Sequence, residues 1–126
     1  RAMYGDGRAW AHDSIGVTSP SASWYLAEGS TGGGMETFVL IQNPGAAAAV
    51  VDVSFQTDSG EVKPNDLQGV GIEAGTRRTF KVNDYVSDSY NVSTRVEATS
   101  GQVICERAMY GDGRAWAHDS IGVTAL

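Results

Sequence analysis

The sequence predicts an all-β protein, an antiparallel β-sandwich of immunoglobulin-like character. Short runs of apolar and β-branched residues alternate with polar residues, and Gly, Asn, Asp and Pro separate the runs, which is typical of strands and turns. Helical periodicity is almost missing. About seven to nine short strands are expected, recurring roughly every ten residues, as in sandwich domains. A closed β-barrel is the alternative architecture.

The expected strands follow one another with turn residues between them. A single helical turn is expected after the fourth strand, within residues 83–90. A hairpin is expected over residues 107–124, with Gly111, Asp112 and Gly113 supplying positive φ at its tip. The other expected strands are residues 24–27, 35–43, 49–57, 76–82, 91–99 and 102–110.

The strand at residues 35–43 is apolar on both faces, with Phe38 and Leu40 on one and Val39 and Ile41 on the other. Such a strand is expected to be central and covered on both sides. Same-face positions on successive strands predict one core. Its expected members are Phe38, Leu40, Val51, Val53, Phe55, Phe80, Val82, Val96 and Ile104.

One segment of the chain occurs twice. RAMYGDGRAWAHDSIGVT spans residues 1–18 and returns unchanged at residues 107–124, which gives a period of 106 (107 minus 1). A period of this length suits an autonomous domain in a tandem array. We expect residues 1–18 to be the terminal hairpin of a preceding repeat, residues 19–23 a linker, and residues 24–124 one β-sandwich repeat domain.

The first copy of the segment is expected to need a partner surface. An isolated two-stranded hairpin is marginal in water, and this one carries Met3, Tyr4, Trp10 and Ile15. We expect these four residues to form an interface with another copy of the domain, in the same chain or in a neighbouring chain.

Charge and cysteine content exclude several classes of partner and scaffold. The net charge is −6, which argues against nucleic acid and anionic membrane surfaces as partners. No apolar run is long enough for direct membrane insertion. The single cysteine, Cys105, excludes an internal disulfide framework and is expected to be a small buried side chain.

Two patterns resemble sites of known chemistry but lack an essential part. The glycine-rich stretch at residues 29–34 follows a strand, yet it lacks the Lys-Ser/Thr of a phosphate loop and leads into a strand. His118, Asp119 and Ser120 are the residue types of a hydrolase triad, but neighbours on a strand point to opposite faces. We expect a hairpin loop and a structural histidine instead.

Other polar and aromatic residues leave binding alternatives open. Asn91 begins a glycosylation sequon, Asn-Val-Ser, by pattern alone. Calcium would need clustered carboxylates, for which the candidates are Asp6, Asp13, Glu28, Glu36, Asp112 and Asp119. A glycan would need exposed aromatic faces, for which the candidates are Tyr4, Trp10, Tyr25, Tyr110 and Trp116.

Two blocks of sequence carry a family resemblance. WYLAEGSTGGGMETFVLIQNPG, followed by ERAMYGDGRAWAHDSIGVT one domain later, resembles the tandem repeats of very large bacterial and archaeal cell-surface proteins, a family without an assigned biochemical activity. The resemblance implies an extracellular module in an array and carries over no site residues.

Together these observations predict a non-catalytic structural repeat module at the cell surface, in a stalk, fibre or surface layer. Its partners are expected to be other copies of the same repeat, without a cofactor, a metal or nucleic acid. The alternative is an adhesin or carbohydrate-binding module, which needs several exposed aromatic residues on one face. An enzyme would need a cleft containing His118 and an acid with a shifted pKa.

Overall fold

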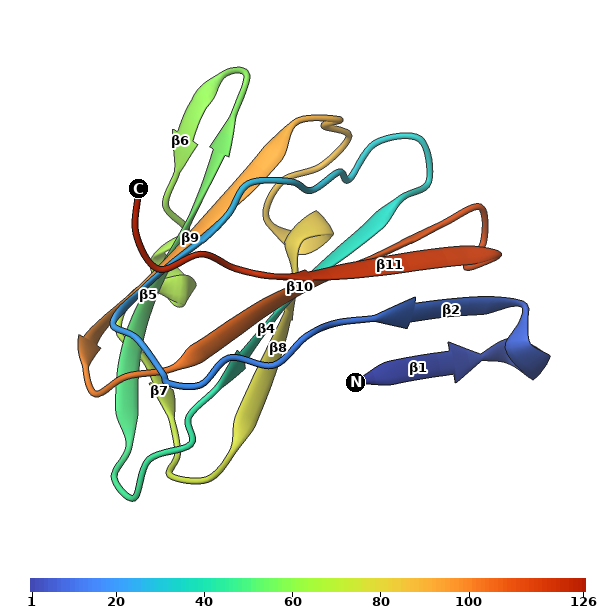
Figure 1. Ribbon diagram of the computed structural model, residues 1–126. Helices are drawn as coiled ribbons and strands as arrows, with labels where there is room; N and C mark the ends of the chain where they lie inside the picture. The colour runs from blue at the N-terminus through green and yellow to red at the C-terminus, as the bar shows by residue number, and fades with distance from the viewer.

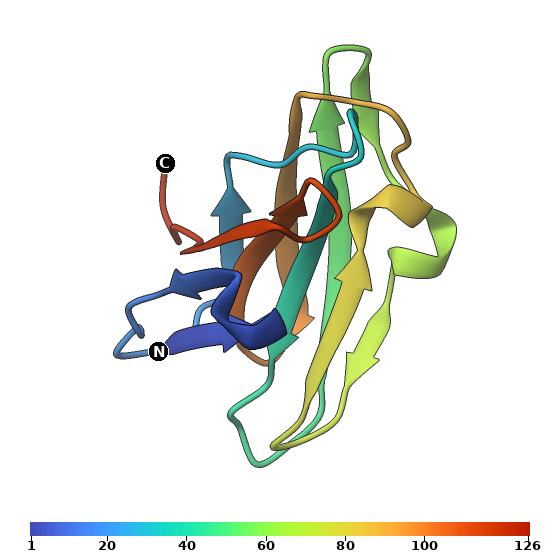
Figure 2. The same cartoon turned by 90° about the vertical axis from the view of Figure 1, so that its right-hand side faces the viewer.

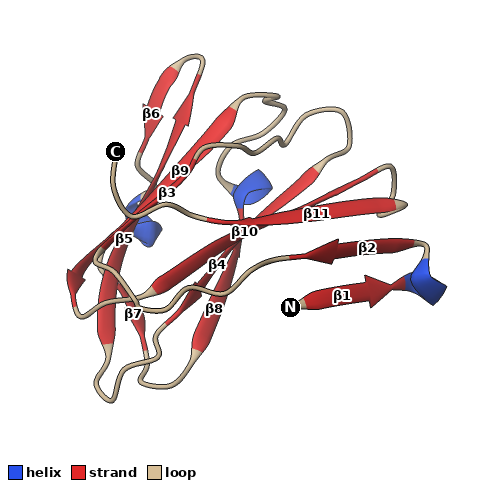
Figure 3. Ribbon diagram, in the orientation of Figure 1, coloured by secondary structure: helices blue, strands red, loops and turns tan.

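The computed structural model describes residues 1–126 and consists of strands joined by loops and three short 3-10 turns (Figures 1 and 3). The turns are η1 (Asp6–Arg8), η2 (Asn65–Leu67) and η3 (Val82–Asp84). The structure has no helix with the length and apolar character needed to span a membrane. The strands are β1 (Ala2–Gly5), β2 (Trp10–Asp13), β3 (Ser23–Leu26), β4 (Glu36–Gln42), β5 (Ala49–Thr57), β6 (Gly60–Val62), β7 (Val70–Ile72), β8 (Arg77–Lys81), β9 (Val92–Ser100), β10 (Ile104–Gly111) and β11 (Trp116–Ile121).

Two antiparallel sheets pack face to face, which confirms the predicted β-sandwich (Figure 2). One sheet has the order β11-β10-β4-β8. The other has the order β3-β9-β5, with both β6 and β7 paired to β5. β1 and β2 form a separate hairpin beside the four-stranded sheet.

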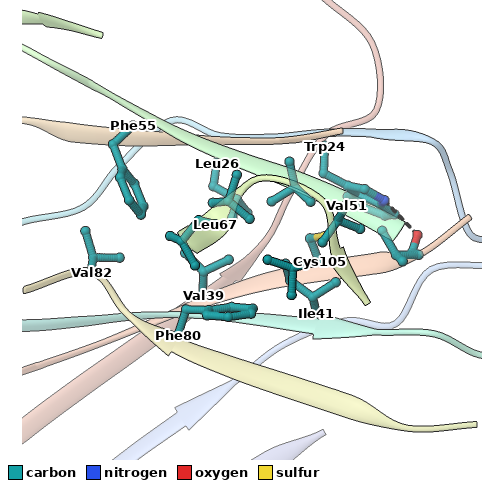
Figure 4. Close-up of a cluster of buried hydrophobic side chains, with 14 of the residues drawn as sticks. Trp24, Leu26, Val39, Ile41, Val51, Phe55, Leu67, Phe80, Val82 and Cys105 are labelled. Atoms are coloured by element: carbon teal, nitrogen blue, oxygen red, sulfur yellow. Dashed lines mark hydrogen bonds between the residues drawn. The ribbon is translucent and has the colours of Figure 1, made fainter. Parts of the chain in front are cut away.

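The core lies between the two sheets (Figure 4). Trp24 is fully buried at one end, where its indole Nε1–H donates to the carbonyl of Val103 at 2.7 Å. Phe55 is fully buried near the other end, and its ring stacks on Tyr85 with 6.0 Å between centroids. Burial raises the pKa of the Cys105 thiol, which packs in this core as a small apolar side chain.

The predicted core is right on most strands, wrong on β4 and only partly right on β10. Val51, Val53, Phe55, Phe80, Val82 and Val96 are core residues, as predicted. On β4, however, Val39 and Ile41 are fully buried, whereas Phe38 and Leu40 point to the outer face. On β10 the core residue is Cys105, and Ile104 is half-buried and packs against the core.

β4 is central, between β10 and β8, and apolar on both faces as expected. Its inner face meets the other sheet, and its outer face lies beneath the β1–β2 hairpin. Sandwich packing covers only one face of a sheet, so this hairpin is what covers the second.

The predicted hairpin, linker and helical turn can each be located in the structure. Residues 1–13 lie outside both sheets. Ser21, within the predicted linker 19–23, already pairs with Val103 through two backbone hydrogen bonds. β6 and β7 were not predicted, and the expected helical turn is the 3-10 turn at Val82–Asp84.

Candidate functional site: the contact between the two hairpins

The repeated segment folds into the same hairpin twice. The tip of the first copy has φ values of 51°, 65° and 70° at Asp6, Gly7 and Arg8, and the corresponding residues of the second copy have 51°, 62° and 69°. The predicted positive φ at Gly111 is wrong, because Arg114 adopts that conformation instead. The hairpin geometry therefore follows from the segment itself and not from its surroundings.

A glycine opposite a tryptophan explains how each hairpin holds its aromatic residues. A Cβ added to Gly5 would lie 1.9 Å from the Trp10 ring, and one added to Gly111 would lie 1.9 Å from the Trp116 ring. The indole thus lies directly over the glycine backbone and stacks on the histidine two residues further on. The ring centroids are 5.7 Å apart for Trp10 and His12, and 5.8 Å for Trp116 and His118.

In the second copy, one face of the hairpin closes the sandwich. Arg107 and Met109 on this face are buried. Arg107 Nη2 donates to Glu28 Oε2 at 3.1 Å, and its Nη1 lies 2.9 Å from His118 Nδ1. Burial, with the neighbouring Arg107 charge, lowers the pKa of His118, so a neutral imidazole accepts the arginine hydrogen bond.

In the first copy, the same face packs on the outside of the second copy. The Tyr110 ring lies at the centre of the surface on which the first hairpin packs. It contacts Trp10 and His12 edge-on, at centroid distances of 5.4 and 6.0 Å. Phe38 packs edge-on against the same tyrosine at 5.8 Å. Met3 lines the cleft that remains between the hairpin and the sheet.

Charged groups complete this contact. Arg1 forms ion pairs with Asp119 and, at 3.1 Å, with Glu106. His12 Nδ1 lies 3.0 Å from Asp119 Oδ1, although neither atom has the alignment of a hydrogen bond. The Asp119 carboxylate has no solvent exposure, so the first hairpin covers it completely.

The two carboxyl groups in the contact have pKa values displaced in opposite directions. Burial, and then the hydrogen bond with Asp119, raises the pKa of Glu106. Burial would also raise the pKa of Asp119, but its contacts with Glu106, His12 and Arg1 hold it below its ordinary value. The pair therefore holds one proton, on Glu106, over the pH range between the two values.

A second ion cluster anchors the tip of the second hairpin. Arg114 donates to both oxygens of Glu36, and Lys81 donates to Glu36 Oε1 at 2.8 Å. These bonds, led by that from Arg114, lower the pKa of Glu36 to about 2. Arg8, the equivalent of Arg114 in the first copy, forms no ion pair. The first hairpin is thus held more loosely at its tip.

The four predicted interface residues divide into two pairs. Trp10 and Met3 face the body, although Met3 keeps 37% exposure. Tyr4 and Ile15 are 64% and 81% exposed. Tyr4 lies on the other face of β1 from Met3, and Ile15 lines a cleft beside Leu40. Arg1 and His12 were not predicted, although strand alternation places them on the face of Met3 and Trp10.

The residue patterns of known chemistry are not assembled into sites. The backbone N–H groups of Ser30, Thr31 and Gly32 donate to Thr37 and Ser89, which occupies the donors a phosphate would need. His118 contacts Arg107 on the inner face of the sheet, whereas Asp119 contacts the first hairpin on the outer face. The triad geometry is therefore absent.

The binding candidates are likewise dispersed. No group of three or more His, Cys, Asp or Glu side chains could hold a metal ion. Asn91 is exposed, and its amide donates to Asp58 at 2.8 Å. Of the aromatic candidates, Tyr110 lies beneath Trp10, and Trp116 and Tyr4 keep 39% and 64% exposure.

We expect Tyr110→Ala to weaken docking of the first hairpin by about 1–3 kcal/mol, because two aromatic contacts of about 0.5–1.5 kcal/mol each are lost. Tyr4→Ala is the matched control, since it removes the same residue from an identical hairpin where it is exposed. The Trp10 indole N–H resonance reports docking, and that of the fully buried Trp24 reports folding. Equal Trp10 shifts in both variants would refute this assignment of the contact.

The free energy of unfolding should depend on pH in two limbs. The Asp119 contribution, with its lowered pKa, is present above the ordinary aspartate value of about 4 and is lost as pH falls through the lowered value. The Glu106 contribution, with its raised pKa, is present below the ordinary glutamate value of about 4.3 and is lost as pH rises through the raised value. The folded chain should therefore be most stable in mildly acidic solution.

Urea titrations repeated from pH 3 to pH 8 measure this profile. Glu106→Gln cannot ionise and should flatten the limb at higher pH while leaving the acid limb in place. Arg1, His12 and Asp119 are the other titratable groups at Glu106, and Arg77 lies across the adjoining cleft. An unchanged upper limb in Glu106→Gln would assign that limb to another group.

The fold and the contact define a β-sandwich domain with a duplicated, self-contacting hairpin. The chain belongs to the family of unknown function DUF5719, whose model matches residues 4–106. The match thus spans nearly one period of the repeat. A search of curated protein sequences gave no match.

Solved structures share the fold. A crystal structure of Thermotoga maritima 1070 is similar with a TM-score of 0.72 and 16% identity, over 86% of this chain and 97% of that one. The Anabaena sensory rhodopsin transducer is similar with a TM-score of 0.58 and 16% identity, over 73% of this chain and 99% of that one. At this identity the likeness concerns the fold alone.

Proposed function

We propose that this protein is a non-catalytic structural repeat module of an extracellular, cell-surface protein, acting through spacing and association with copies of itself. One observation carries the proposal: the same hairpin face packs on two different acceptors. In the second copy this face closes the sandwich, and in the first copy it covers the outside of the second. A segment that binds its own duplicate is suited to association between repeats.

Spacing follows from the connection between the hairpin and the sandwich. Val17, in the connecting segment, packs against the core, and Ser21 already belongs to the sheet. The segment is thus anchored four residues after the hairpin ends at Asp13. In an array in which each interior hairpin closes the sandwich before it, successive domains would be held at a regular interval.

Location at the cell surface is supported by composition and by resemblance. The chain is acidic, with a net charge of −6, and its two motif blocks resemble repeats of large surface proteins. The absence of catalysis is supported by the separation of His118 from Asp119 and by the raised pKa of the buried Cys105 thiol. Trp24 is buried and Tyr110 is covered, which leaves few aromatic residues for an adhesin platform.

A chain of three periods tests the proposal. It carries residues 1–106 three times in succession, followed by residues 107–126. Small-angle scattering should show a maximum dimension that grows by a constant increment for one, two and three periods.

The control replaces Ser19 and Pro20 with Gly in every period, which loosens the connection at two residues that lie outside the sheets. The increments should then shrink with each added period, as in a flexible chain. Shrinking increments in the unmodified chain would show that the repeats do not set a spacing.

A further inference from the structure

The first hairpin is attached to the body by side chains alone. No backbone hydrogen bond joins residues 1–20 to the sandwich, and the first such bond along the chain is made by Ser21. β2 lies next to the edge strand β11 without pairing to it (Figure 1). Release of the hairpin would therefore break ion pairs and aromatic contacts but no sheet.

The connection contains a short hinge. Ser14, Ile15 and Gly16 are exposed or half-buried and lie between the hairpin and the anchored Val17. Gly16 has open space around its Cα, with no atom within 4 Å of an added Cβ. Rotation at a few such residues can carry an attached element away from its body.

The face beneath the hairpin needs a cover. It presents Phe38, Leu40 and Tyr110 beside the carboxyl groups of Glu106 and Asp119. Exposed together, these apolar side chains would form a patch of the kind that marks an interaction site. The hairpin supplies apolar surface together with the positive charge of Arg1, which complements the two acids.

We propose that this outer face binds the Arg1–Ser14 hairpin of a second copy of the chain, so that two molecules exchange hairpins. The inference rests on the proposed function and names its partner and surface. The occupant is chosen because the same segment already fills this face within one molecule, and every contact can form identically between molecules. Exchange of an identical element is a common route to dimers.

The geometry allows two assemblies. Reciprocal exchange closes a dimer, whereas one-way donation leaves an unfilled face at one end and extends into a row. Within one molecule, a short linker gives the hairpin an effective concentration of about millimolar. Exchange between unmodified chains therefore requires similar concentrations, or a change that prevents docking within one molecule.

Charge reversal supplies that change in the full chain. Arg1→Glu puts a third carboxylate against Glu106 and Asp119, and Asp119→Lys puts an ammonium group against Arg1 and His12. Each variant alone should be monomeric with its hairpin released. In the mixture, the unmodified hairpin of Asp119→Lys meets the unmodified face of Arg1→Glu, and the two altered groups meet as Glu and Lys.

Light scattering after size exclusion should give a 1:1 dimer for the mixture and monomers for each variant alone. The double variant, Arg1→Glu with Asp119→Lys, is the control that restores a matched pair within one molecule and should be monomeric. A mixture that stays monomeric near 1 mM overturns the inference, because this concentration matches the effective concentration of the hairpin within one molecule.

The Trp10 indole resonance distinguishes failure of the exchange between molecules from failure of the hairpin contact itself. If Tyr110→Ala shifts it while the mixture stays monomeric, the hairpin docks only within one molecule, and the proposed function keeps its support. If Tyr110→Ala leaves it unchanged, the contact itself is wrong, and the exchange and the observation behind the proposed function are both lost.

Discussion

Phe55→Ala should lower the free energy of unfolding by about 3–5 kcal/mol, the usual cost of truncating a fully buried aromatic side chain. Phe55 lies near the end of β5 with no exposed surface, and its ring stacks on Tyr85. Truncation removes apolar burial and leaves a cavity that the paired strands on both sides cannot close. The measurement is a urea titration followed by circular dichroism.

The matched control is Gln56→Ala, one residue along the same strand and on its other face. Gln56 is half-buried and accepts one hydrogen bond from Ser93, so its loss should cost less than about 1 kcal/mol. A cost below about 1 kcal/mol for Phe55→Ala would mean that β5 presents its other face to the core.

β5 shows what a sequence predicts well. Val51, Val53 and Phe55 alternate with Asp52 and the polar residues that follow, so only one face can be buried without cost. The structure buries that face. Where polarity alternates cleanly, the period of two is sufficient to assign the orientation of a strand.

β4 shows where the same reasoning fails. Both of its faces are apolar, so alternation says that both are covered but not which cover is the core. The choice depends on the neighbouring strand β10. There the chain buries Arg107 beside Cys105, and a charged residue on the inner face makes that face look solvent-exposed in the sequence.

The buried Arg107 is tolerated because its partners lie at the edge of the sandwich. Glu28 comes from the loop after β3, and His118 comes from β11. Neither partner is identified by spacing along the chain, since Glu28 is separated from Arg107 by 79 residues. Long-range polar pairs of this kind cannot be found from local patterns.

Only part of the hairpin contact could be predicted from the sequence. The exact repeat and the exposed apolar residues indicate that the first copy needs a surface, and strand alternation groups Arg1, Met3, Trp10 and His12 on one face. The acceptor was not predictable, because it combines residues of β4 with residues of β10 and β11. That combination arises only when the sheet forms.

The assignment of the two faces of β4 leads to the other large expected effect. Ile41→Ala should cost about 2–5 kcal/mol in the free energy of unfolding, because Ile41 has no exposed surface and packs between the sheets. Leu40→Ala should cost about 1 kcal/mol, since Leu40 is half-buried on the outer face and loses less apolar burial.

The two variants should also differ in their effect on docking of the first hairpin. Leu40 lines the cleft beneath the first hairpin, so Leu40→Ala should shift the Trp10 indole resonance at a denaturant concentration where the sandwich is still folded. Ile41→Ala should leave that resonance in place until the whole domain unfolds, since Ile41 faces away from the hairpin. The opposite ranking of unfolding free energies would restore the predicted orientation, with Leu40 in the core, and it would leave the hairpin without the apolar surface on which its docking depends.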